Sequence, residues 1–440
     1  MNKTWIYPAI LTIALGLGTG QPTSAHEGGA DSAGAIKVEV VKQGEGYVLL
    51  RGGKPYTIKG AGVSNSNLEN LALHGANSFR NWGVRDIERG LELLDKAEEL
   101  GLTVAMCLDI GRERLGFDYD NAELVAQQLE AMRKQVLAMK DHPALLLWII
   151  GNEPDLQHTN PKVFNAINDI SRMIHEVDGN HPTTTALASS YKPDLARLIE
   201  ERAPDLDIIS MQKYADVVNV PRYIKEANID QPYLVTEWGT RGHWEVEKTA
   251  WGAPIEPNSS EKAKLYQHHY ELAISAVPEQ IVGSYVFYWG QKQERTPTWY
   301  GLFLVDGSET ETIDYMHYVW NETWPDNRSP QVGKMVLDGQ LSGTDIILEP
   351  GSDYEASIIA TDPDADALSH RWELMHESQA TQVGGDKEVV PDVLDGLVES
   401  TGGGSVTVTT PDKPGAYRLF VYVYDGQGNA GYANTPFLVE

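Results

Sequence analysis

The chain has 440 residues, a formal net charge of −28 and one cysteine, Cys107. This length accommodates one large domain and a smaller one, and the negative charge argues against nucleic acid or an anionic membrane surface as a partner, because both bind basic patches. A single cysteine excludes an intramolecular disulfide and a cysteine-based metal cluster. Cys107 lies in the apolar run LTVAMCLDI and is expected to be a small buried hydrophobe.

Residues 1–25 have the features of a secretory signal peptide. A positive charge precedes an apolar stretch, and the small residues TSA, ending at Ala25, form a cleavage site. The stretch is short for a membrane anchor and is interrupted by Pro8 and several glycines. We therefore expect export to the periplasm or the extracellular space, a flexible polar segment over residues 26–35, and no membrane insertion of the mature chain.

Eight apolar runs, each suited to a β-strand, alternate with helical patterns from residue 58 onward. The runs are 58–63, 77–82, 103–109, 145–152, 183–188, 207–212, 232–237 and 283–289. Between them, residues 84–101, 121–142 and 259–277 place apolar side chains at helical spacing. This alternation predicts an α/β fold, a closed (β/α)8 TIM barrel over residues 36–327. An open doubly wound sheet is the alternative, but the chain has no Gly-rich phosphate-binding turn.

The composition changes near residue 328, where NRSPQVGKMVLDG is typical of a linker. Alternating strand patterns with turn signals follow and predict a small all-β domain over residues 328–440, most simply an immunoglobulin-like two-sheet sandwich. Its DPDADA loop, residues 362–367, is dense in the oxygen ligands that calcium prefers. An acidic turn in an acidic protein is the simpler interpretation, and we expect no metal site.

Two of the predicted strands end in a glutamate. The fourth ends in WIIGNEPD, with Glu153, and the seventh in LVTEWG, with Glu237. The carboxyl ends of barrel strands meet at one mouth, so both side chains would reach the same site from nearly opposite sides. Glycoside cleavage needs such a pair, because one carboxyl group protonates the leaving oxygen while the other attacks the anomeric carbon or activates water. Either glutamate alone could instead cap a helix or form a stabilising ion pair.

Further candidate site residues follow the other strands. Arg80, with Trp82 beside it, would end the second strand and keep a carboxylate ionised, since a nearby cation lowers the pKa of a carboxyl group. Tyr214 would follow the sixth strand and donate a hydrogen bond to Glu237. Trp289 would follow the eighth strand and form a flat apolar floor for a sugar ring. Packing in the core or at the rim of the barrel is the alternative for each.

Two long loops offer aromatic side chains that would suit stacking along a glycan. TRGHWEVEKTAWGAPIEPN follows the seventh strand and carries Trp244, and GQKQERTPTWYG follows the eighth and carries Trp299. Bracing of the loops is the alternative role for these rings. The same loops also carry Arg241, His243, Trp251, Gln291, Lys292, Glu294 and Tyr300.

Together these motifs resemble the glycoside hydrolases of clan A, and most of all the catalytic barrel of glycoside hydrolase family 2. The motifs are GGKPYTIKG and GANSFRNW around the first two strands, DHPALLLWIIGNEPD at the fourth and YLVTEWG at the seventh. The resemblance implies that Glu153 is the acid/base, that Glu237 is the nucleophile, and that Asn152 binds the sugar 2-hydroxyl. It also implies retention of configuration at a β-linked glycoside, without a cofactor.

Two features depart from the family 2 pattern. Its members usually carry β-sandwich domains before the barrel, whereas here a sandwich is predicted after it. The sixth strand has Gln212 in a region where asparagine is more usual. Family 5 or a smaller clan A family therefore remains an alternative.

The sequence thus predicts a glycosidase, a retaining β-glycoside hydrolase of polysaccharide degradation that works by double displacement on a carbohydrate substrate. The same residues would make a transglycosylase if a sugar outcompeted water as the acceptor. A non-catalytic glycan-binding protein with a degenerate barrel is a third hypothesis, against which the intact Glu153 and Glu237 argue. The aromatic loops and the acidic surface favour a β-glucanase, endo-acting or exo-acting.

Overall fold

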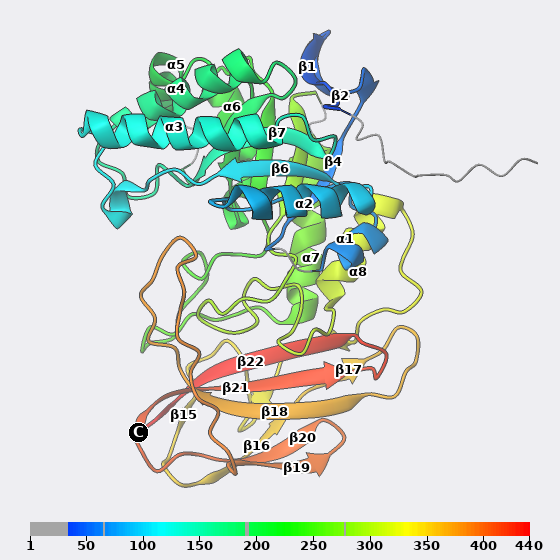
Figure 1. Ribbon diagram of the computed structural model, residues 1–440. Coiled ribbons are helices and arrows are strands. Elements are labelled where there is room, and N and C mark those ends of the chain that lie inside the picture. Colours follow the sequence, from blue (N-terminus) through cyan, green and yellow to red (C-terminus); the bar gives the residue numbers. More distant parts are fainter. Residues whose placement is uncertain (1–33, 65–66, 190–192, 277–278) are drawn as a thin grey trace, which may run out of the picture. The chain divides into compact units, whose positions relative to one another are not determined.

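A computed structural model describes residues 34–64, 67–189, 193–276 and 279–440 (Figure 1). The predicted signal peptide, residues 1–25, and most of the segment 26–35 lie outside the described residues. Residues 34–440 belong to one unit. Among the described residues, no helix is both long and apolar enough to cross a membrane.

Eight parallel strands close into a barrel. They are β4 (Ile58–Gly62), β5 (Ser78–Arg80), β6 (Thr103–Leu108), β7 (Leu145–Asn152), β8 (Thr183–Leu187), β9 (Ile209–Gln212), β10 (Tyr233–Trp238) and β11 (Ile281–Val286). Each strand pairs with the next in the chain, and β11 pairs with β4 to close the ring. Every strand overlaps the run predicted for it, so the TIM barrel prediction is confirmed.

The apolar composition of the barrel strands follows from their burial on both faces. All eight residues of β7, LLLWIIGN, are buried, because the outer face of a barrel strand packs against helices and its inner face fills the barrel. Cys107 on β6 is buried in the same way, as expected. In β7 the polar Asn152 is the last residue of the strand and lies where the strand reaches the mouth of the barrel.

Helices cover the outside of the barrel. They are α1 (Leu68–Leu73), α2 (Ile87–Glu99), α3 (Ala122–Met139), α4 (Lys162–Val177), α5 (Pro193–Arg202), α6 (Val220–Glu226), α7 (Ser259–His269) and α8 (Glu311–Asn321). Short helical turns lie at η1 (Glu113–Leu115), η2 (Ala215–Asn219) and η3 (Tyr270–Ser275). Polar side chains cap several starts: Asp86 accepts a backbone N–H at α2, Asn121 does so at α3, and Asn258 with Glu261 forms a capping box at α7.

A small antiparallel sheet precedes the barrel and consists of β1 (Val38–Gln43), β2 (Gly46–Arg51) and β3 (Lys54–Pro55). Val38 and Leu49 belong to the same apolar cluster as the residues inside the barrel. The backbone N–H of Val38 donates to the carbonyl of Asn180, just before β8. The sheet therefore covers the amino-terminal end of the barrel, opposite the mouth.

The chain after the barrel forms two β-sheets. Their strands are β13 (Val336–Leu337), β14 (Gln340–Leu341), β15 (Ile347–Leu348), β16 (Asp353–Ser357), β18 (Ser369–His376), β19 (Val398–Gly402), β20 (Ser405–Thr409), β21 (Gly415–Tyr424) and β22 (Ala430–Val439), with β12 (Gln331–Val332) and β17 (Ala360–Thr361) as a separate pair. One sheet has the order β14-β13-β16-β20-β19 and the other β15-β22-β21-β18. A single apolar cluster contains Val406 and Val408 of one sheet and Leu419 and Val421 of the other. The domain boundary at residue 328 and the immunoglobulin-like topology stay predictions.

Candidate active site

A cavity of about 1030 Å³ lies at the carboxyl ends of the barrel strands. Both predicted glutamates line it: Glu153 follows β7 and Glu237 lies on β10. This volume is at the upper end of the range in which proteins enclose small ligands. The barrel topology thus brings together two carboxyl groups that are 84 positions apart in the chain, since 237 minus 153 is 84.

Glu237 is 4% exposed, and four side chains donate hydrogen bonds to its carboxylate. Oε1 accepts from Arg80 Nη1 at 3.2 Å, from Trp82 Nε1 at 2.7 Å and from Gln212 Nε2 at 2.9 Å, and Oε2 accepts from the Tyr214 hydroxyl at 3.0 Å. The predicted contacts of Arg80 and Tyr214 are present. Several donors around a carboxylate fix its direction, so the Glu237 carboxylate is held in one orientation.

Asn152 is the last residue of β7 and joins this network. Its Oδ1 accepts from Arg80 Nη2 at 2.6 Å and from Gln212 Nε2 at 2.7 Å. Both donors engage the amide oxygen, so the orientation of the amide group is fixed and its NH2 is the end left for a ligand in the cavity. Gln212, at the position where the sequence departs from the family pattern, thus contacts both Asn152 and Glu237.

The chain turns sharply where it leaves β7. Gly151 has φ 79° and Glu153 has φ 50°, both in the left-handed region. This conformation is unfavourable in free energy for a glutamate, and such strained residues occur often at functional sites. Asp155, two residues on, accepts the backbone N–H groups of Ala188 and Ser189 at 2.8 Å each. These bonds tie the turn to the end of β8 and hold Glu153 at the cavity.

The environment of Glu153 differs from that of Glu237. Burial, together with the negative charges of Glu237 and Asp155, raises the pKa of Glu153 to about 8, against the opposing effect of Arg80 and Arg112. Among the described residues, none donates a hydrogen bond to its carboxyl group. Glu153 is therefore mainly protonated at neutral pH and can give its proton to a group bound in the cavity.

Two predicted substrate-binding tryptophans, Trp289 and Trp299, do not line the cavity. Trp289 is 0% exposed, donates from Nε1 to Asn70 at 3.0 Å and packs on Trp320 of α8. The chain leaves β11 at Val286, so strand alternation no longer governs which ring faces inward. Trp299 is also 0% exposed and donates from Nε1 to the carbonyl of Arg241 at 3.0 Å, so it braces the two loops.

Other aromatic side chains form the apolar walls of the cavity. Phe287 and Tyr288, immediately before Trp289, line it, as do the predicted Trp82 and Trp244. Trp244 is 56% exposed and meets the ring of Tyr214 edge-on at a centroid distance of 5.7 Å. The rings that line the cavity after β11 are therefore those of Phe287 and Tyr288, whereas the predicted Trp289 lies away from it.

The polar lining is partly as expected. His243, Gln291, Lys292 and Glu294 of the two loops line the cavity, whereas Arg241, Trp251 and Tyr300 do not. The sequence interpretation missed further lining residues, which are Ser64, Arg112, Leu156, Ala188, Lys213, Asp216, Glu245, Gln293, Val383, Gly384, Gly385, Asp386, Lys387, Glu388 and Val390. Lys213 directly follows β9, and its position at a strand end was the available signal. The residues from 383 onward gave no such signal because they lie beyond the predicted barrel.

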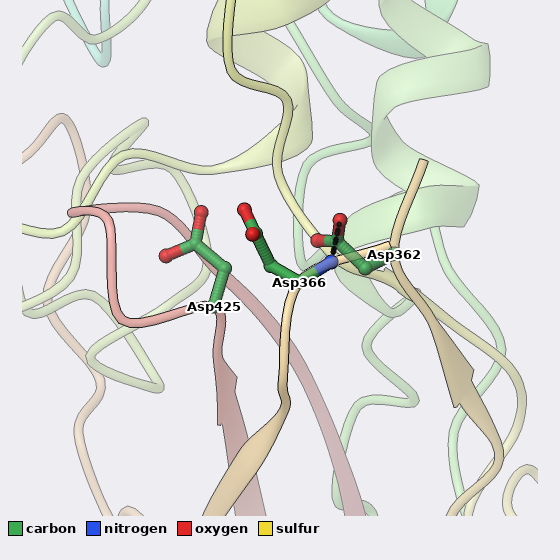
Figure 2. Close-up of side chains that lie close together, drawn as sticks. All are labelled: Asp362, Asp366 and Asp425. Atoms are coloured by element: carbon green, nitrogen blue, oxygen red, sulfur yellow. Dashed lines mark hydrogen bonds between the residues drawn. The ribbon is translucent and has the colours of Figure 1, made fainter. Parts of the chain in front are cut away.

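One acidic cluster among the described residues is close enough to hold a metal ion. Oxygen atoms of Asp362, Asp366 and Asp425 lie within 4.8 Å of one another (Figure 2). Asp362 Oδ1 accepts the backbone N–H groups of Asp364 and Asp366, and Asp425 Oδ1 accepts two backbone N–H groups of its own turn. Such bonds are typical of aspartate-stabilised turns, which is the interpretation favoured from the sequence.

Residues 59–271 match the model of a protein family described as glycosyl hydrolases family 2, TIM barrel domain. The barrel of this chain thus resembles the TIM barrel domain of these glycosyl hydrolases. The resemblance to clan A glycoside hydrolases, expected from the strand-end motifs, is thereby confirmed for this part of the chain. A comparison of the chain with the curated proteins gives no match.

Several solved structures are similar to this chain at low sequence identity. A β-glucuronidase from Ruminococcus gnavus, solved in complex with a C6-substituted uronic isofagomine, is 16% identical, with a TM-score of 0.51 over 65% of this chain and 53% of that chain. A β-D-glucuronidase for Dictyoglomus thermophilum is 16% identical (TM-score 0.49, 66% of this chain and 54% of that chain). A putative β-galactosidase from Bacteroides fragilis is 13% identical (TM-score 0.48, 92% and 58%). The matched parts are thus between half and two thirds of these longer proteins.

Proposed function

We propose that this protein is a retaining β-glycoside hydrolase acting on β-linked glycans. The observation that carries the proposal is the contrast between two carboxyl groups in one cavity. Burial raises the pKa of Glu153 to about 8, whereas the carboxylate of Glu237 accepts four hydrogen bonds that fix its orientation. Retaining glycosidases need this combination of a protonated acid and an ionised nucleophile.

In the proposed first step, Glu153 donates its proton to the glycosidic oxygen while Glu237 attacks the anomeric carbon. The bond to the leaving group breaks, and an ester forms between the sugar and Glu237. In the second step, the Glu153 carboxylate takes a proton from water, the water oxygen attacks the anomeric carbon, and Glu237 leaves as a carboxylate. The NH2 group of Asn152 would bind the 2-hydroxyl, and Trp82, Trp244 and Tyr288 would contact the apolar faces of sugars.

A product analysis by mass spectrometry tests the activity. Wild-type protein and Glu237→Gln would be incubated separately with a panel of β-linked oligosaccharides, β-glucans included. Shorter products with the wild type alone support a glycosidase and identify the sugar. Longer products indicate that a sugar replaces water as the acceptor, which makes the protein a transglycosylase with the same residues. An unchanged panel with the wild type contradicts the proposal and favours a glycan-binding protein.

The roles of the two glutamates are tested separately with azide and an aryl β-glycoside that carries a good leaving group. For Glu153→Ala, azide should attack the glycosyl-enzyme from the face that water would use and restore turnover with a β-glycosyl azide product. For Glu237→Ala, azide should replace the nucleophile and give the α-glycosyl azide. Both anomers can be distinguished by proton NMR, and exchanged outcomes would mean that the two roles are reversed.

We also propose that the protein is exported after cleavage of a signal peptide following Ala25, and that its β-rich C-terminal part is an immunoglobulin-like domain. The N-terminal sequence is consistent with export because it combines a positive charge, an apolar stretch and a small-residue cleavage site. Mass spectrometry of the protein recovered from outside the cytoplasm should show a chain that begins at His26. A chain that retains residues 1–25 would contradict this proposal.

A further inference from the structure

A long segment of the β-rich C-terminal part reaches the cavity of the barrel. It comprises residues 377–397, which connect β18 to β19. A bridge between Met375 and Val393 closes its base, and the backbone N–H of Leu394 donates to the carbonyl of Leu374 at 2.7 Å. Residues 383–388 and Val390 line the same cavity as Glu153 and Glu237.

Two arginines of the barrel hold this segment. Arg114, in the turn after β6, forms a two-pronged ion pair with Asp386, with N–O distances of 2.7 and 3.3 Å. Arg295, after β11, donates to Glu388 through its backbone N–H at 2.6 Å and through Nη1, and it donates from Nη2 to the carbonyl of Gln382 at 3.1 Å. The Arg114 and Glu388 side chains are almost fully buried. Such paired geometry fixes orientation as well as position.

The start of the segment, at Glu377, is also held by buried hydrogen bonds and an ion pair. Arg418 of β21 forms two 2.8 Å bonds with Glu377, the first residue of the segment, and it also donates to the carbonyl of Pro254 at 2.8 Å and to Asn434 at 2.7 Å. Asn434 in turn donates to Glu256 at 2.7 Å. All of these side chains are buried, and separating buried charges from their partners is costly. The β-rich part and the barrel therefore hold the segment in one place.

The two anchors lie on either side of strands β4 and β5. In the barrel order, β11 is followed by β4, β5 and β6, so the turns that carry Arg295 and Arg114 flank these two strands. The connection after β5 is short, residues 81–86, and Ser64 and Trp82 line the cavity beside these two strands. The C-terminal segment adds further lining on this side of the mouth.

We propose that residues 383–390 form a substrate-binding wall that limits how far a glycan extends past the cleavage point on the β4–β5 side. The side chains available for sugar contact are Val383, Lys387 and Val390, which line the cavity and are exposed, Val390 to 54%. Among the described residues, none pairs with Lys387. The C-terminal part thereby becomes a specificity-determining part of the active site. This inference rests on the proposed glycosidase function.

The test compares kcat/KM across β-linked oligosaccharides of increasing length. Asp386→Arg places two like charges together and should displace the wall. We expect the ratio of kcat/KM for the longest to the shortest substrate to rise about tenfold. The exchange Arg114→Asp with Asp386→Arg restores the pair and should restore the wild-type ratio. Glu399→Arg, an equal charge change at an exposed position of β19, is the matched control.

A loss of stability alone would lower kcat/KM by the same factor for every substrate length. A change in the ratio of kcat/KM between the longest and the shortest substrate therefore indicates a change in the wall itself. Lys387→Ala, at an exposed position without a partner among the described residues, is a second variant that should keep its fold. It should raise KM for oligosaccharides several-fold. An active wild type whose chain-length ratio is unaltered in both variants contradicts the inference and leaves the proposed function standing. A wild type inactive on every substrate contradicts both.

Discussion

The ends of β7 and β10 and the segment 377–397 reach the same cavity by different means. The first two position Glu153 and Glu237 on, or directly after, buried barrel strands, where burial and backbone pairing hold them. The segment has no regular structure over most of its length and is held by ion pairs to Arg114, Arg295 and Arg418. The comparison teaches that the proposed catalytic groups lie on rigid strands, whereas the proposed substrate-binding wall is an irregular segment held by ion pairs.

The strongest test of the strand-borne pair is Glu237→Gln. We expect kcat to fall by roughly 10⁴-fold or more, because an amide cannot form the glycosyl ester. Glu245→Gln is the matched control, since Glu245 lines the same cavity and its only donors within the described part of the chain are the backbone N–H groups of Ala215 and Gly242. Steady-state kinetics on an aryl β-glycoside measure both. Similar losses for the two variants would contradict a nucleophilic role for Glu237.

The next largest effect is expected for Glu153→Gln, with a fall in kcat of about 10²–10⁴-fold for a poor leaving group. Burial raises the pKa of Glu153 to about 8, and the acid must be protonated to act. In the wild type, kcat/KM should therefore fall as the pH rises through about 8, and the variant should lack this limb. A pH–rate profile measures it, and an alkaline limb retained by Glu153→Gln would assign that limb to another group.

The same shift predicts a pH dependence of stability. The pKa of Glu153 is raised in the folded protein from its ordinary value of 4.5 to about 8, so the folded state binds this proton more tightly than the unfolded chain. Its stabilising contribution is complete below about pH 4.5 and is lost as the pH rises to about 8. Urea unfolding of Glu153→Gln should therefore show a smaller loss of stability over this interval than the wild type. Equal losses would contradict the shift.

Removing the ion pair between Arg418 and Glu377 tests how the C-terminal segment is attached. Arg418→Met leaves Glu377 buried without its partner, and we expect the free energy of unfolding to fall by about 3–5 kcal/mol. The double variant Arg418→Met/Glu377→Leu removes both charges and should recover most of this loss. Denaturant unfolding measures both variants. If the double variant is as unstable as the single one, the ion pair is not the reason for the effect.

The smallest effect on stability is expected at Trp244, in contrast to Trp289. Trp244→Ala should raise KM several-fold and change the free energy of unfolding by less than about 1 kcal/mol, because the ring is mostly exposed. Trp289→Ala should lower the free energy of unfolding by about 3–5 kcal/mol, because it opens a cavity in the core. Thermal unfolding combined with KM measurements separates the two. A raised KM with unchanged stability for Trp289→Ala would instead support a substrate-binding role for Trp289.

The sequence by itself determined the barrel and its two carboxyl groups. Strand and helix periods are local properties, and a buried parallel strand that ends in a glutamate places that glutamate at the barrel mouth whatever surrounds it. Arg80 and Tyr214 followed from the same strand-end reasoning. The family match over residues 59–271 confirms the resemblance that these motifs carried.

Only the tertiary structure decided which aromatic rings line the cavity and which residues complete it. Beyond Val286 the chain leaves β11, so no period distinguishes Tyr288, which lines the cavity, from Trp289, which is buried. The pKa of Glu153 depends on burial and on charges from other strands. Arg114 and Asp386 lie 272 positions apart, and their pairing follows from the docking of the C-terminal part on the barrel. No local pattern encodes such a contact, because it depends on two surfaces that meet only after each has folded.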